Sequence, residues 1–547
     1  MPTEYVPGYK SVGSGCKLLQ LGKGAEALRW SIREGTELPI LSAHPSQCDF
    51  TPHHLRVHYP RLFQLIVVLG FGGTFQYGFQ ISVLNSPSPF IKAFINETWL
   101  RRYNSPITGG TLTLLWSLIV SVYSIGGLIG ALVSGYFIGL YGKRTCQVCN
   151  SIFPVVAFVL VACCRIARSF EMILIGRFLF GFNAGLGLNI HAQYLGEIAP
   201  KKLRGFTNVT CSIFVTFGKF CGQIVGLREL FGTESLWPYA MSVCAVASLV
   251  QLFSLPFLPE TPPYLLMEKQ DEAGCMKAVQ QLWGKGDHRA EIEEMKQEKA
   301  AMKSTKIMSV LDLLRDRSVR LQLYVMVTLM VGLQLSGINA IYFYSYEVFR
   351  EAGFSDDQIP YIVPGVGVCE TLSTVISGFL VDRFGRKGLI LTGYSLMGLV
   401  LVLLTITLSL KVWFPWLSYA SIALIILFTL LFGVGPSGVT MAICVEIFTQ
   451  SSRAAALVVA GSLNWVGLCM IGMAFPYVVV GLRQYCFLVF LVCIVLTVIF
   501  CFMFLPETKG KSVLEVTEDF RKYKSPRKHV LGPAENSNNQ RTMATRL

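Results

Sequence analysis

Residues 135–144 read GYFIGLYGKR, and residues 378–387 read GFLVDRFGRK. Each stretch ends a long apolar run, and the glycine before its basic pair stands at 142 or 385, an offset of 243 positions. Two further motifs recur at nearly the same offset: Glu197 with Arg204 matches Glu446 with Arg453 at 249, and Pro259-Glu260-Thr261 matches Pro506-Glu507-Thr508 at 247. Three motifs repeated at nearly one offset indicate a duplicated chain with two similar halves.

Only 15% of the 547 residues are charged, whereas an average globular domain has about 25%. Apolar residues make up 52%, and the mean hydropathy is +0.52. Such a chain buries its apolar side chains in lipid, which excludes a soluble enzyme, a disordered scaffold and a fibrous protein. The net charge of +14 collects in the tails and between the apolar runs, as expected of loops beside an anionic leaflet. We therefore expect membrane lipids as partners and no nucleic acid.

A helix needs about 20 apolar residues to cross a membrane. Twelve runs of that kind are present, at 63–83, 113–137, 149–166, 172–192, 206–227, 237–258, 322–345, 360–381, 388–410, 416–446, 454–481 and 483–505. The sequence therefore predicts an all-α membrane protein of twelve transmembrane helices. The expected parts are an N-terminal tail (1–60), a six-helix half (61–258), a helical linker (259–321), a second six-helix half (322–505) and a C-terminal tail (506–547). A parallel repeat of this kind is typical of major facilitator transporters, which hold their substrate between the halves.

Short basic loops predict the orientation of the chain. The loops after the second, fourth and eighth runs are the most basic, with Lys143 and Arg144, Lys201, Lys202 and Arg204, and Arg383, Arg386 and Lys387. The positive-inside rule then places both tails and the linker in the cytoplasm. The loop after the first run is extracellular, and its Asn96-Glu97-Thr98 is a predicted N-glycosylation site.

The repeated motifs place carboxylates and guanidinium groups at cytoplasmic helix ends. Bidentate bonds between such groups can tie the inner ends of the two halves together while the substrate site faces outward. The predicted gating network comprises Arg177, Glu197, Arg204, Arg386, Glu446, Arg453, Glu260 and Glu507. In the alternative interpretation, the basic residues only anchor loops at the lipid headgroups.

Several motifs together resemble one family. They are Gly176-Arg177-Phe178, Tyr194-Leu195-Gly196-Glu197, Pro259-Glu260-Thr261-Pro262, Gln334-Leu335-Ser336-Gly337-Ile338-Asn339, Asp382-Arg383-Phe384-Gly385-Arg386 and Pro506-Glu507-Thr508-Lys509-Gly510. The chain resembles the animal facilitative hexose transporters, a sugar porter branch of the major facilitator superfamily, from about residue 61 to 512. Phe75-Gln76-Tyr77-Gly78 and Asn85-Ser86-Pro87 are similar to the subgroup that includes the fructose transporters.

The resemblance implies a hexose site between the halves. Its predicted members are Gln334, Asn339, Tyr77, Asn464, Trp465, Ser212, Glu370 and Met441. Amides suit sugar hydroxyls, which both donate and accept hydrogen bonds. Gln334 and Asn339 are five residues apart, about 140° round a continuous helix, although such amides can instead bond a neighbouring helix. Trp465 has packing as its alternative role.

The chain departs from the family at this site. Leu333 replaces the first of two glutamines, Ser212 replaces a third, and Met441 replaces a tryptophan of the glucose-selective branch. These changes predict a wider cavity with fewer amides and a looser choice between glucose and fructose. Glu370 is similar to a residue of a urate-transporting relative. Glu370 and Lys219 are ionisable residues within apolar runs, and Lys219 either faces a cavity or reaches toward the membrane surface.

Facilitative uniport is the expected function, and a proton-coupled symporter, a urate transporter and a non-transporting sugar sensor are the alternatives. A symporter of this family carries an acid in its first span, but residues 61–95 contain neither Asp nor Glu. We expect neither an enzyme nor a bound cofactor or metal, because no such residue cluster is visible. We expect a plasma-membrane location, and the C-terminal residues Thr545 and Leu547 fit a PDZ-type groove.

Overall fold

The computed structural model describes residues 59–200, 203–284, 286–304, 308–411, 413–482, 485–511 and 513–524. The two tails predicted at 1–60 and 506–547 lie largely outside these residues, as does the predicted PDZ-type motif at Thr545 and Leu547. The side chain of Arg204 is also outside the described part.

The described chain is helical. The first half contains α3 (Pro60–Leu69), η1 (Gly70–Thr74), α4 (Phe75–Ser82), α5 (Ser88–Tyr103), α6 (Gly109–Tyr141), α7 (Lys143–Asn150), α8 (Ile152–Cys163), α9 (Glu171–Ile198), α10 (Arg204–Val225), α11 (Trp237–Ser242), α12 (Ala245–Ser254) and η3 (Leu255–Phe257). The linker contains α13 (Pro262–Met267), α14 (Glu272–Trp283), α15 (Arg289–Ser304) and α16 (Val310–Arg315). The second half contains α17 (Arg320–Gln334), α18 (Ile338–Glu351), α19 (Ile359–Phe384), α20 (Arg386–Leu410), α21 (Leu417–Phe432), η4 (Gly433–Ser437), α22 (Gly438–Glu446), α23 (Gln450–Leu482), α24 (Cys486–Phe504) and, after it, α25 (Val513–Lys524).

These helices match the twelve predicted spans. Eleven stretches of the described chain are long and apolar enough to cross a membrane, and the shorter apolar helix Thr210–Val225 stands at the fifth position. The predicted all-α membrane fold is confirmed. The loop expected after the first span is instead the helix α5, so Asn96 is an exposed helical residue and Thr98 of its glycosylation motif is buried.

Glycine stands in irregular segments of the first, seventh and tenth spans. In the first span a π-helical segment covers Gly70–Thr74, and in the tenth another covers Gly433–Ser437. The seventh span is broken between α17 and α18, where Gly337 has a φ of +98°. A side chain at Gly337 would be strained, and its Cβ would lie 2.8 Å from the Phe490 ring. Such breaks in membrane helices are tolerated where the backbone is buried in protein or lines a cavity.

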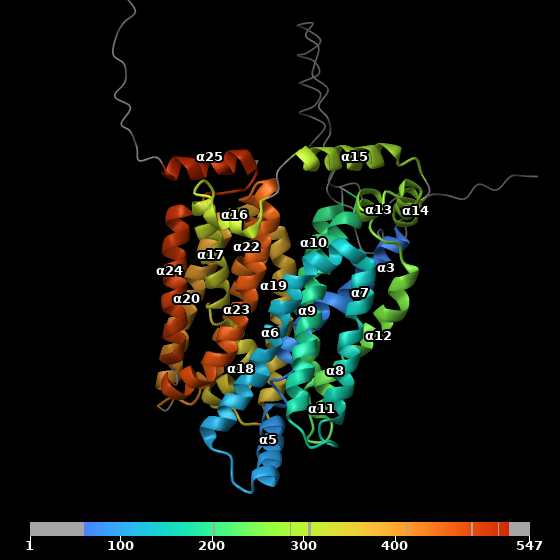
Figure 1. Ribbon diagram of the computed structural model, residues 1–547. Helices are drawn as coiled ribbons and strands as arrows, with labels where there is room; N and C mark the ends of the chain where they lie inside the picture. Colours follow the sequence, from blue (N-terminus) through green and yellow to red (C-terminus); the bar gives the residue numbers. More distant parts are fainter. Residues whose placement is uncertain are drawn as a thin grey trace, which may run out of the picture. The chain divides into compact units, whose positions relative to one another are not determined.

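Both halves contribute to one set of packed helices. Within the first half α6 packs on α9, and within the second α20 packs on α21 and α24; across the halves α6 contacts α23, and α10 contacts α19. Figure 1 shows α13, α14, α15, α16 and α25 at one end of the helices and α5 and α11 at the other. We name these the linker end and the α5 end.

Candidate functional site

Three amide side chains form a chain of hydrogen bonds at the break in the seventh span. Gln334 is the last residue of α17, and its Nε2 donates to Oδ1 of Asn464 on α23 at 2.7 Å. Asn339, the second residue of α18, donates from Nδ2 to Oε1 of Gln334 at 2.7 Å. The two amides therefore meet directly rather than lying 140° apart on one helix, because Leu335 to Gly337 interrupt that helix.

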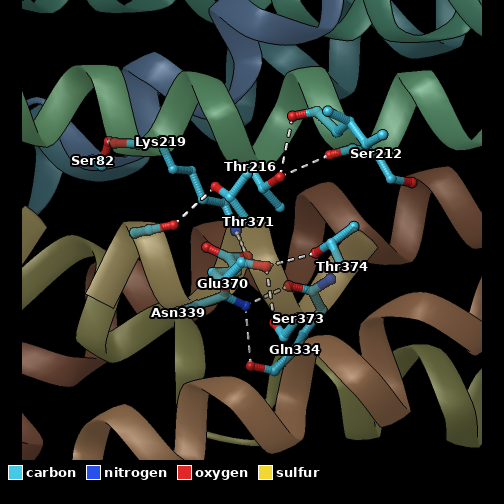
Figure 2. A network of polar contacts seen from close by, with 12 residues as sticks. Ser82, Ser212, Thr216, Lys219, Gln334, Asn339, Glu370, Thr371, Ser373 and Thr374 are labelled. Atoms are coloured by element: carbon cyan, nitrogen blue, oxygen red, sulfur yellow. Dashed lines mark hydrogen bonds and ion pairs between the residues drawn. The ribbon is translucent and has the colours of Figure 1, made fainter. Parts of the chain in front are cut away.

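A buried ion pair joins the two halves beside these amides. Lys219 Nζ on α10 lies 2.6 Å from Oε1 of Glu370 on α19, and their side chains are 9% and 1% exposed. Lys219 also stands 3.8 Å from the ring centroid of Tyr342, which lies one helical turn beyond Asn339 on α18. Figure 2 shows Lys219 reaching from α10 to Glu370. Lys219 thus faces the other half and not the membrane surface.

An aromatic contact also crosses the halves. Trp465 on α23 is 1% exposed, and its ring centroid lies 5.4 Å from that of Tyr77 on α4 and 5.8 Å from that of Tyr123 on α6. A Cβ at Gly127 would lie 2.2 Å from the Trp465 ring, so this glycine makes room for the indole. The geometry agrees with the packing role that the sequence left open for Trp465.

The remaining predicted site residues stand in more open positions. Ser212 is exposed on α10, two turns before Lys219. Met441 on α22 is 50% exposed. Tyr77 and Asn464 are partly exposed, and Asn464 is held by Gln334. The structure therefore brings Gln334, Asn339 and Asn464 together. Glu370 lies beside them, because its partner Lys219 contacts Tyr342 on the same helix as Asn339. Ser212 and Met441 are accessible but make no described contact with these residues.

The α5 ends of the two halves are bonded to each other. Asn85, between α4 and α5, donates from Nδ2 to the carbonyl of Tyr342, and its Oδ1 accepts from the backbone N–H of Ser345 at 3.3 Å. Two ion pairs lie nearby, between Lys92 and Glu347 at 2.7 Å and between Arg228 and Asp357 at 2.6 Å. All three contacts join the first half to the second. The structure thus has its halves held together at the α5 end.

At the linker end, the predicted gating carboxylates are bonded within their own halves. Glu197 pairs with Lys143 at 2.9 Å. Glu446 pairs with Arg386 at 3.1 Å and accepts a hydrogen bond from Thr508 at 2.5 Å. Nη2 of Arg453 donates to the carbonyl of Phe448 at 3.3 Å. Among the side chains that the structure describes, which do not include that of Arg204, these contacts do not join the halves.

Two members of the predicted network have a different role. Glu507 accepts from the backbone N–H groups of Arg386 at 2.9 Å and Lys387 at 3.0 Å, at the start of α20. Glu260 accepts from the N–H of Arg144 at 3.1 Å, at the start of α7. The prediction that they pair with guanidinium groups is therefore corrected: each carboxylate satisfies the free N–H groups of a helix N-terminus.

The two capped corners are copies of one structure. Gly142 precedes α7 and Gly385 precedes α20, and both have a φ of +82°. A Cβ at Gly142 would lie 2.7 Å from Tyr264, and one at Gly385 would lie 2.7 Å from Oε2 of Glu507. Glycine is required at both corners because the backbone is left-handed and the carboxylate is close. This explains the motif repeated at an offset of 243.

The two capping carboxyls nevertheless differ in acidity. Burial raises the pKa of Glu260 above its ordinary value and outweighs the N–H groups of Arg144 and Thr261, which lower it. Burial also acts to raise the pKa of Glu507, but four backbone N–H groups outweigh it and the net shift is downward. The difference follows from the number of N–H groups and the depth of burial.

The structure places Arg177 away from the other members of the predicted gating network. Arg177 is fully buried near the start of α9, about five turns before Glu197 and therefore toward the α5 end. Its Nη1 donates to the side-chain oxygen of Gln80 at 2.8 Å, its Nε donates to the carbonyl of Ile119 at 3.3 Å, and its guanidinium lies 4.6 Å from the Tyr123 ring centroid. The sequence motif places Arg177 within the fourth span, and the direction of α9 puts it toward the α5 end rather than the linker end.

Comparison with known proteins identifies the family. A family model described as "Sugar (and other) transporter" matches residues 65–520, most of the chain. The chain belongs to this sugar transporter family. It is 43% identical over 463 residues to the mouse "Solute carrier family 2, facilitated glucose transporter member 9", covering 84% of this chain and 86% of that protein. It is 40% identical over 463 residues to the horse member 5, covering 85% and 92%.

A solved structure shows the same fold. The inward open conformation of the xylose transporter XylE from E. coli has a TM-score of 0.69 at 20% identity, covering 84% of this chain and 99% of that one. The same protein bound to 6-bromo-6-deoxy-D-glucose is described as a major facilitator superfamily protein. The predicted major facilitator fold is confirmed for this sugar transporter family member.

Sequence reasoning about this transporter missed the contacts between its halves. Lys219 stands out in the sequence as an ionisable residue in a span, but its partner Glu370 is 151 positions away and no local pattern connects the two. In the sequence, Asn85 is only part of a family motif, and the pairing of Lys92 with Glu347 has no sequence signal. Within the described residues, no group of three or more His, Cys, Asp or Glu side chains could hold a metal ion.

Proposed function

We propose that the protein transports hexoses, fructose and/or glucose, as a facilitative uniporter that works by alternating access. The amide chain of Asn339, Gln334 and Asn464 carries this proposal. It stands at a broken helix beside the junction of the halves, and it offers the donors and acceptors that sugar hydroxyls need. The relatives are named facilitated glucose transporters, which supports the same substrate class.

The absence of proton coupling is supported by the surroundings of two charged residues. Arg177 on α9 donates to the neutral amide of Gln80 in the first span. Residues 61–95, which include that span, contain neither Asp nor Glu. Glu370 is paired with Lys219 at 2.6 Å, so its charge is balanced by the protein itself. A proton-coupled carrier of this family is expected to have an acid in its first span, and residues 61–95 contain none.

The departures from the family favour a broad hexose site. Leu333, exposed Ser212 and half-exposed Met441 offer fewer amides than the glutamines and the tryptophan that the resemblance leads one to expect. With fewer fixed donors, the site discriminates less between sugars that differ in the position of one hydroxyl.

We further propose that the linker end is cytoplasmic, that both tails lie on that side, and that the protein resides in the plasma membrane. The basic residues Lys143, Arg386 and Lys387 at the linker end support this orientation. In this proposal, Glu197, Arg204, Glu446 and Arg453 join the linker ends of the halves when the α5 end opens. The binding of Glu197 and Glu446 within their own halves agrees with a linker end that is open here. We propose a carrier rather than an enzyme.

Uptake into liposomes tests the function. Purified protein is reconstituted, and the entry of labelled fructose, glucose and urate is measured with and without an inward pH gradient, with protein-free liposomes as the control. Uniport predicts that fructose or glucose equilibrates and that the gradient causes no accumulation. Concentrative uptake would contradict uniport, and entry of urate without either hexose would replace the proposed substrate class.

A further inference from the structure

Three ion pairs between described residues join the halves, and they differ in burial. Lys92–Glu347 and Arg228–Asp357 are partly or largely exposed, with side chains between 26% and 75% exposed. The side chains of Lys219 and Glu370 are only 9% and 1% exposed. Exposed pairs add little because water screens them, whereas two buried charges depend strongly on each other. Separation of the halves therefore affects the Lys219–Glu370 pair more than the other two.

The position of the pair shows which motion separates it. Lys219 lies six residues before α10 ends at Val225, and Glu370 lies eleven residues after α19 begins at Ile359. Both positions are nearer to the α5 end than to the linker end. The backbone of Lys219 is fixed against α4, since Ser82 Oγ donates to its carbonyl at 2.6 Å. When the α5 ends move apart, α10 and α19 move with their halves and the two charges separate.

We propose that Lys219 is a positioning residue for the transport cycle: its ion pair with Glu370 holds the α5 ends of the halves together, and it opens each time the site faces that end. The proposal rests on alternating access. In the closed arrangement, the ammonium group is satisfied by Glu370 and the face of Tyr342. In the open arrangement, water solvates both charges. The gain from pairing and the loss of hydration oppose each other, so neither arrangement traps the protein.

Removal of one charge therefore has a directional effect. In Lys219→Met, Glu370 is buried without a partner only when the α5 end is closed, so the population shifts toward the arrangement in which that end is open. Glu370→Gln leaves Lys219 unpartnered and shifts the population in the same direction. The double variant has no unpaired charge, so its shift is smaller than that of either single variant. A role in helix packing alone predicts no such reversal.

Hydrogen exchange measured by mass spectrometry tests this on the full-length protein in lipid nanodiscs, without sugar. Exchange is followed in peptides that cover residues 82–88 and 338–351 at the α5 end. Each single variant is expected to raise exchange there at least tenfold, and the double variant to return within about threefold of the native protein. Lys92→Met is the matched control, because its pair joins the same halves at the same end but is solvated; it should stay within about threefold.

The result overturns the proposal if either single variant leaves exchange at the α5 end unchanged, or if the double variant shows the product of the two single effects. A peptide at the start of α20 reports general unfolding. If exchange rises there too, the charge-reversed variant Lys219→Glu with Glu370→Lys is measured. Restored protection of the α5-end peptides supports the role of the ion pair, and continued exchange in these peptides refutes it. Because no sugar is present, the outcome is independent of whether the protein carries hexoses.

Discussion

Gln334 provides a sharp test of the substrate site. Its amide makes two side-chain hydrogen bonds of 2.7 Å, to Asn464 and from Asn339, and it is 3% exposed. Gln334→Ala removes an amide that a bound hexose would use and leaves polar partners unsatisfied, which costs about 1–3 kcal/mol per lost bond. The dissociation constant for fructose or glucose should therefore rise by about ten- to a hundredfold.

The assay compares hexose binding and uptake with thermal stability. Purified variants are examined by equilibrium binding of labelled sugar and by uptake into liposomes, and their melting temperatures are recorded in the same lipid. Gln322→Ala is the matched control, since it removes an equally buried amide from the same helix, and that amide donates to Thr517 outside the predicted site. If Gln334 contacts sugar, Gln334→Ala loses affinity while Gln322→Ala keeps it, whatever stability each variant loses. Normal binding and transport by Gln334→Ala would refute the reasoning and leave the amide chain with a packing role.

Four further outcomes are expected. Gly385→Ala should lower the melting temperature, because a backbone with a φ of 82° and a ψ of 165° is nearly restricted to glycine and costs another residue about 1–3 kcal/mol. The added Cβ would also lie 2.7 Å from the Glu507 carboxylate. Gly388→Ala, whose Cβ meets nothing within 4 Å, should not lower it. Because the pKa of Glu507 is lowered in the folded protein, its stabilising effect is complete above about pH 4.5 and is lost as the pH falls through its folded pKa. In thermal melts, Glu507→Gln should therefore lose less stability on acidification than the native protein does. An equal loss would count against the capping role of Glu507. Glu446→Gln should label faster at a cysteine placed at the linker end, and unchanged labelling with full transport would favour headgroup anchoring. Treatment with an N-glycosidase should shift the mass of protein from animal cells but not that of Asn96→Gln, and a shift in the variant would place the glycan elsewhere.

The membrane class, the twelve spans and the internal repeat can be read from the amino-acid sequence. The length of a span follows from the thickness of the bilayer, and a duplicated chain repeats its motifs at nearly constant offsets. Both the spans and the repeat are therefore visible in the order of residues along the chain. The Gly142 and Gly385 corners show why the repeat persists: each needs a left-handed residue beside a carboxylate. The role of that carboxylate was not readable, because backbone N–H groups at a helix start leave no mark in the sequence.

The contacts between the halves cannot be read from the sequence, because their partners are far apart along the chain. Lys219 and Glu370 are 151 positions apart, and Asn85 meets Ser345 across 260 positions, so helical periodicity carries no information about either contact. The end at which Arg177 acts depends on how α9 crosses the helix bundle, and the meeting of Gln334 with Asn339 depends on the break at Gly337. Local patterns encode which face of a helix is polar, but the partner on that face is fixed by the packing of the whole chain.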